Sequence, residues 1–288
     1  MPRWDYDMSD IILDTLIDAA KLLPFLFLTY LTMEWLEHKA GDKAEALIKR
    51  AGRFGPVIGG LLGVVPQCGF STAASNLYAG RVITVGTLVA IYLSTSDEML
   101  PILISEHAPA EVILPILLAK ALIGMAAGLL IDFGMRGRGK EEHAHIHEMC
   151  EQERCHCEKG ILRSAFSHTV QIAVFILLIT FVLNLLLYFV GEDVLAGVIS
   201  DRPVTGPLLA GLVGLIPNCA GSVAITQLYL EGIIGFGSAM AGLLAGSGVG
   251  LLVLFRVNHD RKENVKILGL LYGIGVAAGI VMELWPDF

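Results

Sequence analysis

Long apolar stretches dominate this chain and are separated by short polar segments. A stretch of roughly 18 or more apolar residues is long enough to cross a bilayer as a helix. The first one lacks a small-residue cleavage site and is too long for a signal peptide, so we expect it to be retained. The pattern predicts an all-α polytopic protein of the lipid bilayer, with long helices at about residues 11–36, 82–104, 111–133, 163–190, 233–255 and 267–285.

Two further apolar segments, at about residues 55–80 and 206–231, are related in sequence. Aligned at an offset of 151 residues, Gly55 to Tyr78 and Gly206 to Tyr229 share eleven of twenty-four positions. Each copy places a P-x-C motif between two arms that are only about half a bilayer long. Pro66 and Pro217 lack a main-chain N–H and clash with the preceding turn, so both should break a helix. Each copy is therefore predicted to form a re-entrant hairpin or a pair of short helices.

Positive charge predicts the orientation in the membrane. Three loops rich in Lys and Arg should face the cytoplasm, which places both termini outside; these loops are residues 39–53, 134–163 and 256–266. The mostly acidic segment 105–110 should then lie outside, so an odd number of crossings separates it from the first basic loop. The same parity holds in the second half. We therefore predict two inverted-topology repeats, residues 1–133 and 162–288, joined by a cytoplasmic linker at 134–161.

Polar and thiol side chains gather at the two P-x-C breaks. Backbone without helical hydrogen bonds is tolerated at membrane depth only where it is packed in protein or lines a cavity. The alternative interpretation is that the cysteines are small apolar residues and that the hydroxyls join helices. The candidate substrate-binding residues are Gln67, Cys68, Ser71, Thr72, Asn218, Cys219 and Ser222.

Two adjacent acids, Asp97 and Glu98, interrupt the apolar stretch at 82–104. Carboxylates within a membrane helix are costly and are functional candidates by default. We expect them to bind a cation or to carry protons, unless they lie at the external end of the helix. The equivalent stretch of the second half keeps a serine, Ser247 for Ser96, but lacks both acids.

The linker between the halves is rich in imidazole and thiol ligands, which suit zinc or copper. Their spacing matches no closed zinc finger, so we expect a loose sensor, buffer or delivery site, or else a polar linker with incidental ligands. The candidate metal ligands are His143, His145, His147, Cys150, Cys155, His156 and Cys157.

Composition and missing motifs exclude several functions. No basic stripe suggests nucleic acid, and five cysteines so placed do not resemble a secreted disulfide framework. No G-x-x-x-x-G-K-[ST] motif for ATP and no H-E-x-x-H helix occurs. We therefore expect no enzyme and no required cofactor, although a transported or loop-bound metal ion fits the pattern.

Several motifs together resemble the ten-transmembrane heavy-metal exporters, a family also labelled arsenic efflux proteins or manganese transporters. They are PQCGFS (66–71), STSDEMLP (94–101), PNCAGS (217–222), the opening helix LLPFLFLTYLTMEWLEHK (22–39) and the His-rich loop. The resemblance covers nearly the whole chain. It implies ten helices and efflux of a metal or metalloid across the cytoplasmic membrane. It also implies site residues Gln67, Cys68, Ser71, Asp97, Glu98, Asn218, Cys219 and Ser222.

The leading prediction is a secondary transporter that exports manganese or arsenic by alternating access, with protons as the coupling ion. Thiols would suit arsenite or an organoarsenical, whereas manganese prefers oxygen ligands, and the sequence contains both sets. Two alternatives are transport of a non-metal solute and an intramembrane thiol redox protein that uses Cys68 and Cys219. A homo-oligomer is also left open.

Overall fold

The computed structural model describes residues 54–64, 68–96, 99–136, 203–217 and 219–284, together with scattered helical positions between residues 17 and 182. Every regular element within these stretches is a helix, which confirms the predicted all-α fold. The predicted helices at 11–36 and 163–190 and the segments 39–53 and 137–161 lie largely or wholly outside the described residues.

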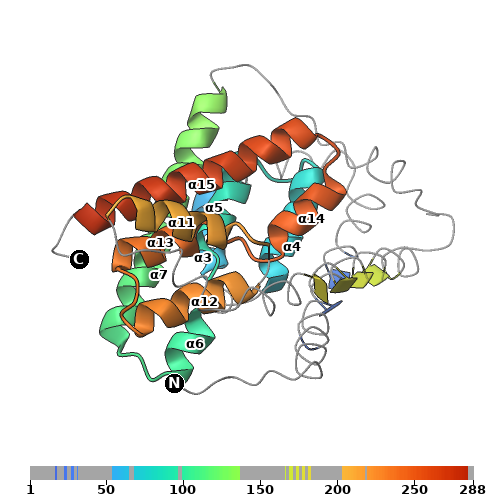
Figure 1. Ribbon diagram of the computed structural model, residues 1–288. Coiled ribbons are helices and arrows are strands. Elements are labelled where there is room, and N and C mark those ends of the chain that lie inside the picture. The colour runs from blue at the N-terminus through green and yellow to red at the C-terminus, as the bar shows by residue number, and fades with distance from the viewer. Residues whose placement is uncertain are drawn as a thin grey trace, which may run out of the picture.

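Two matched sets of helices make up these stretches (Figure 1). The first set is α3 (Gly55–Gly63), α4 (Cys68–Ala79), α5 (Val85–Ser94), α6 (Met99–Ser105) and α7 (Ala110–Arg136). The second set is α11 (Thr205–Gly214), α12 (Cys219–Leu230), α13 (Phe236–Ala245), α14 (Gly250–Val257) and α15 (Arg261–Leu284). Shifted by 151 residues, each helix of the first set starts within one residue of its mate. The repeat therefore extends well beyond the two P-x-C segments.

The predicted continuous helices at 82–104 and 233–255 are wrong, because each is broken in two. α5 ends at Ser94 and α6 begins at Met99, while α13 ends at Ala245 and α14 begins at Gly250. At the ends of α5 and α13 the chain turns extended, with ψ of 127° at Thr95 and 110° at Gly246. Short hydroxyl residues and glycines compete with or weaken the helix at these points. A hydropathy pattern misses the breaks because both sides are apolar.

The last helix begins earlier than predicted. α15 starts at Arg261 rather than near 267, so the predicted basic loop 256–266 shrinks to a short connection between α14 and α15. The Asp260 carboxylate caps the helix by accepting hydrogen bonds from the main-chain N–H groups of Lys262 (3.0 Å) and Glu263 (3.2 Å). These bonds, the one from Glu263 foremost, hold the pKa of Asp260 below its ordinary value. The first turn is helical although it is polar, and an apolar pattern cannot detect it.

Four spans within the described residues are long and apolar enough to cross a membrane: Val85–Ser105, Ala110–Met135, Phe236–Val257 and Arg261–Leu284. The two spans that contain the breaks are 75% and 78% buried inside the protein, whereas the two unbroken spans are each 28% buried. The broken helices therefore form the centre of the bundle, and α7 and α15 present most of their surface outward. This arrangement confirms a multi-pass membrane protein.

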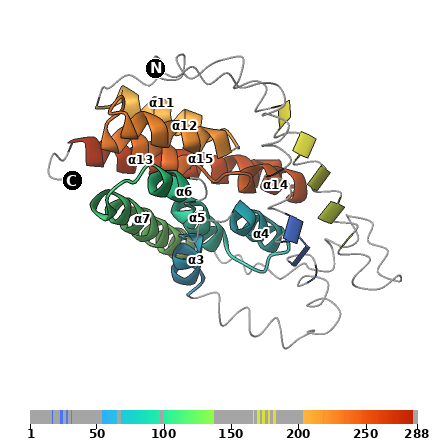
Figure 2. The same cartoon turned by 90° about the horizontal axis from the view of Figure 1, so that it is seen from below.

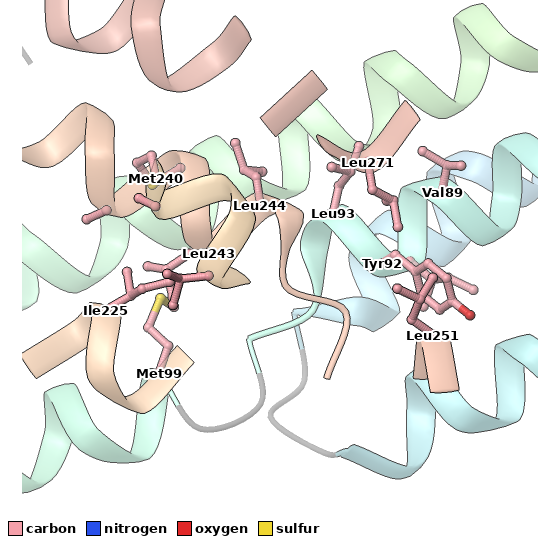
Figure 3. Packing of buried hydrophobic residues seen from close by; sticks show 14 of the residues in the cluster. Val89, Tyr92, Leu93, Met99, Ile225, Met240, Leu243, Leu244, Leu251 and Leu271 are labelled. Atoms are coloured by element: carbon pink, nitrogen blue, oxygen red, sulfur yellow. The ribbon is translucent and has the colours of Figure 1, made fainter. Parts of the chain in front are cut away.

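The two halves exchange the second parts of their broken helices. α14 packs along α4 and α6 packs against α12, whereas α5 and α13 stay with α7 and α15 of their own half (Figures 1 and 2). Met99 of α6 and Ile225 of α12 accordingly share one buried cluster with Tyr92 of α5 and Leu251 of α14 (Figure 3). Lipid tails are as apolar as leucine, so this core is held together by close packing more than by removal of apolar surface from water.

An acid caps the start of each central helix. Asp132, near the end of α7, accepts a hydrogen bond from the main-chain N–H of Gly86 in α5 (2.9 Å). Glu283, its mate at the end of α15, accepts one from Ser238 in α13 (3.0 Å). Carboxylates favour the positive end of a helix dipole, so the first turns of α5 and α13 are both stabilised in this way.

Glycines allow these helices to pack at very short range. A Cβ atom at Gly86 would overlap the carbonyl oxygen of Gly128, and a Cβ atom at the equivalent Gly237 would overlap that of Gly279. Small residues at such crossings are a common way to associate membrane helices. Both halves therefore hold their central helix firmly against the outer helix that follows it.

Candidate functional site

The break between α5 and α6 is buried and lined by hydroxyl groups. Ser94, Thr95 and Ser96 are all buried. The Ser94 and Thr95 hydroxyls donate to the carbonyl oxygen of Ile91 (3.1 and 2.8 Å), and the Ser96 hydroxyl donates to the carbonyl of Ser94 (3.1 Å). The hydroxyls of these three residues thus supply hydrogen bonds to main-chain carbonyls at the end of α5. Buried polar groups in an apolar environment require such partners.

The break between α13 and α14 is stabilised differently. The Gly246 N–H donates to the carbonyl of Gly242 (2.9 Å), after which the chain leaves the helix. Gly248 has a φ of 53°, a left-handed conformation that favours glycine. The carbonyl of Leu243 accepts a hydrogen bond from the Nζ atom of Lys120, which comes from α7 of the other half. A side chain of the first half therefore caps the broken helix of the second.

Lys120 is the most buried charged side chain in the part of the chain that the structure describes, at 1% exposure. A lysine at the centre of a membrane helix costs about 2.5–3.5 kcal/mol on insertion scales, so it is a functional candidate by default. Sequence analysis overlooked it, although it interrupts an otherwise apolar run from Val112 to Ile131. That interruption was a signal of the same kind as Asp97 and Glu98.

A second buried polar contact also joins the two halves. The hydroxyls of Ser75 and Tyr92 lie 2.7 Å apart, and each lies within hydrogen-bond distance of the carbonyl oxygen of Gly250, at 2.7 and 3.1 Å. The equivalent positions of the other half hold Thr226, Leu243 and Met99, so only one half can form this triangle of bonds. It ties the start of α14 to α4 and α5.

Of the predicted substrate-binding residues, Ser71 and Thr72 lie fully buried in the first turns of α4. Ser71 is in tight contact with the other half, because a Cβ atom at Gly250 would lie 2.7 Å from the Ser71 Cβ atom. Ser222, its mate in α12, is partly buried. The first turn of α4 therefore packs directly against the start of α14, next to the break that precedes it.

The two P-x-C motifs occupy equivalent positions in the two sets of helices. Cys68 and Cys219 are the first residues of α4 and α12, and Pro217 lies between the end of α11 and the start of α12. The side chains of both cysteines lie outside what the structure describes. So do Pro66, Gln67, Asp97, Glu98, Asn218 and the predicted metal ligands His143, His145, His147, Cys150, Cys155, His156 and Cys157. Within the described residues, no group of three or more His, Cys, Asp or Glu side chains could hold a metal ion.

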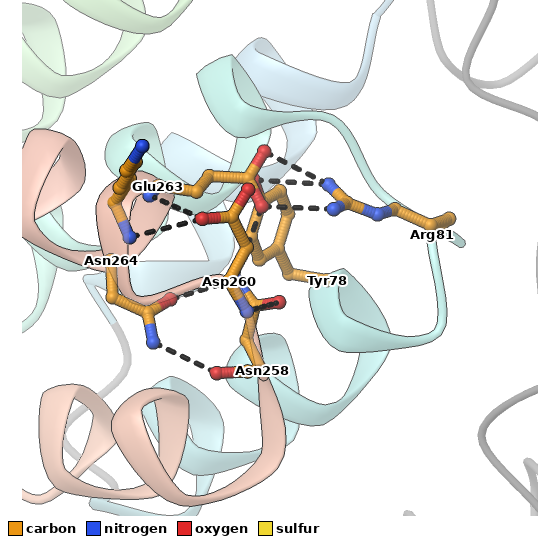
Figure 4. Close-up of polar contacts among 7 residues, drawn as sticks. Tyr78, Arg81, Asn258, Asp260, Glu263 and Asn264 are labelled. Carbon is orange, nitrogen blue, oxygen red and sulfur yellow. Dashed lines mark hydrogen bonds and ion pairs between the residues drawn. The ribbon is translucent and has the colours of Figure 1, made fainter. Parts of the chain in front are cut away.

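An ion pair joins the two halves at one end of the bundle (Figure 4). The Arg81 guanidinium donates to both carboxylate oxygens of Glu263, at 3.1 and 2.8 Å, and stacks over the ring of Tyr78, 5.2 Å from its centre. Asn258 donates a further bond to Glu263 (3.1 Å). Sequence analysis missed this contact, because its partners are 182 residues apart.

Broken membrane helices at equivalent positions of two repeats, with buried polar groups at the breaks, are typical of secondary transporters. The comparison with protein-family models agrees. A family described as 10TM heavy-metal exporter matches residues 7–194 and 157–287, so the chain belongs to that family. No curated protein and no solved structure matches the chain.

Proposed function

We propose that the protein is a secondary transporter that exports a manganese- or arsenic-type ion across the cytoplasmic membrane by alternating access. The observation that carries this proposal is the pair of buried breaks in helices that otherwise span the membrane, in a member of a family described as heavy-metal exporters. Discontinuous helices at the interface of two repeats are where secondary transporters bind their substrates and coupling ions.

Two contacts support an inverted relation between the halves. Arg81, just before α5, pairs with Glu263 in the first turn of α15. Glu283 in the last turn of α15 caps the start of α13. α5 and α13 therefore start near opposite ends of α15 and run toward each other. With the basic loops inside and both termini outside, the Arg81–Glu263 pair would lie at the cytoplasmic end.

The substrate would bind where the first turns of α4 and α12 meet the breaks. Cys68 and Cys219 would select a thiophilic solute, with Ser71, Thr72 and Ser222 and the amides Gln67 and Asn218 completing the site. Asp97 and Glu98 would couple transport to protons. The His/Cys-rich linker would buffer or deliver metal, so its deletion should alter regulation and leave the transport itself in place.

The proposal is tested with purified protein in proteoliposomes. Mn(II), Zn(II), arsenite and a methylated arsenical are offered with and without an imposed pH gradient. Gradient-dependent accumulation of one solute is the expected result and would identify the substrate. No accumulation of any of them would contradict the proposal and favour transport of a non-metal solute.

A matched set of cysteine variants tests the binding site. Replacing both Cys68 and Cys219 by Ser should abolish arsenite transport and should spare manganese transport, because only arsenite requires thiols. The control replaces Cys150, Cys155 and Cys157 by Ser and should transport normally. Wild-type arsenite transport by the first variant would remove the thiols from the site, and with them the thiol redox alternative.

A further inference from the structure

Lys120 lies where the two central helices end. Gly124, one turn further along α7, packs so closely on α5 that a Cβ atom there would lie 2.8 Å from the carbonyl oxygen of Ala90 and 3.4 Å from the main-chain nitrogen of Ser94. α7 runs antiparallel to α5, because Gly128 meets Gly86 at the start of that helix. Lys120 is therefore level with the end of α5, and its Nζ atom reaches the last turn of α13 at the carbonyl of Leu243.

The carbonyl that Lys120 binds is one that a broken helix leaves without an intrahelical donor. In a continuous helix, the Leu243 carbonyl would accept from the N–H of Ser247, but α13 ends at Ala245. In the first half, the equivalent carbonyl of Tyr92 is reached by the N–H of Thr95 (3.3 Å). The carboxyl end of a helix favours a cation, so an ammonium group at this place stabilises the end of α13.

We propose that Lys120 takes part in proton coupling together with Asp97 and Glu98: it exchanges a proton during the transport cycle, and this exchange links the pH gradient to movement of α13. This proposal rests on the proposed function. The ammonium loses one proton to water on the open side of the protein and becomes a neutral amine. The neutral amine is a weaker hydrogen-bond donor than the ammonium, so its bond to the Leu243 carbonyl weakens and the end of α13 is released. Reprotonation from the other side restores the bond.

The surroundings of Lys120 suit such an exchange. α3, α5 and α13 contribute one titratable side chain among their described residues, Tyr92. Asp97 and Glu98 follow Ser96 in the chain and lie outside the described residues. The equivalent of Lys120 in the second half is Leu271, which is also fully buried. The proton-carrying group therefore belongs to one half only, whereas the helix break is common to both.

Arginine at position 120 separates proton exchange from a purely structural role. It keeps the positive charge and the hydrogen-bond donors but does not lose its proton in proteins. Lys120→Arg should therefore fold, bind the solute and slow pH-driven accumulation at least about tenfold, because an obligatory carrier cannot be bypassed. Lys120→Met removes both the charge and the N–H donors and should allow downhill flux that no longer responds to the gradient. The control, Lys262→Arg, changes an exposed lysine on α15 and should behave as wild type.

Size-exclusion profiles and unfolding temperatures establish that the variants are folded. A measurement on the wild type alone guards against variants that do not fold, namely proton release when the solute is added to the protein in weakly buffered detergent. Wild-type accumulation by Lys120→Arg, gradient-driven accumulation by Lys120→Met, or no proton release by the wild type would overturn the role of Lys120. If the wild type moves none of the solutes, the proposed function fails first and the role of Lys120 fails with it.

Discussion

Replacing Arg81 changes two opposing contributions to stability. Arg81 has a positive φ of 56°, and its mate in the second half is Gly232, with a φ of 72°. Both halves thus have a left-handed residue at this position, which is arginine in the first half and glycine in the second. A side chain in this conformation costs about 1–2 kcal/mol, which glycine avoids. The arginine is tolerated because it pairs with Glu263 across the two halves.

The structure allows an estimate of how much the Arg81–Glu263 ion pair contributes to the free energy of unfolding. The two side chains are 21% and 20% exposed and share two hydrogen bonds, so the pair lies between a surface and a buried pair. Hydrogen bonds to charged groups contribute about 1.5–3 kcal/mol, so we assign about 2 kcal/mol to this contact. Arg81→Ala loses the pair and keeps the strain, so it should destabilise by about 2 kcal/mol. Arg81→Gly also loses the pair but relieves strain, so it should cost about 1 kcal/mol.

Reversible unfolding of the purified protein in mixed detergent micelles measures these differences. Glu263→Gln and the double variant Arg81→Ala with Glu263→Gln complete a cycle that isolates the pair. A coupling energy below about 0.5 kcal/mol would show that the ion pair contributes little, as many exposed pairs do. An Arg81→Gly protein that is no more stable than Arg81→Ala would refute the strain argument.

Three further outcomes can be checked with the same unfolding assay. Tyr92→Phe removes a buried hydroxyl that bonds to Ser75 and should cost about 1 kcal/mol, and Ser75→Ala in that background should cost about 1 kcal/mol more, because the Ser75 hydroxyl also bonds to the Gly250 carbonyl. Gly214→Ala places a methyl group on a main-chain carbonyl of α13 and should destabilise strongly, whereas Gly269→Ala, with open space around it, should be neutral or slightly stabilising. The pKa of Asp260 is lowered in the folded state, so its helix cap stabilises the fold at pH values above the ordinary pKa of 3.8. This stabilisation is lost as the pH falls through the lower folded-state pKa. Asp260→Ala should therefore reduce the loss of stability at acid pH.

The repeat is the part of the fold that sequence predicts best. Pro217 lies in a gap between helices, and α4 and α12 begin at Cys68 and Cys219, where the P-x-C motif indicated. A proline acts on its own backbone, so a local pattern is enough to locate such a break. The break after Ser94 was missed because serine and threonine are tolerated inside membrane helices, so their hydrogen bonds to nearby carbonyls need not end a helix.

The residues that join the halves could not be predicted in the same way. The Ser75–Tyr92–Gly250 contact and the Arg81–Glu263 pair connect positions that only folding brings together. Lys120 was visible as a charge in an apolar run, yet nothing in the sequence says that it reaches across to α13. Burial of its ammonium group, which the structure supplies, is what turns an isolated lysine into a candidate for function.

The backbone of this protein is nearly symmetric and its polar chemistry is not, and this difference bears on how it would work. At an offset of 151 residues, Lys120 corresponds to Leu271, Tyr92 to Leu243 and Asp97 to Gly248. In a transporter made of two identical halves, the inward-open and outward-open states would be equal in energy apart from the membrane itself. The side chains that occur in one half only must therefore set which state predominates and where the coupling ion binds. Substitutions at these positions should change the balance between states while leaving the fold intact, and substitutions at the repeated glycines should do the reverse.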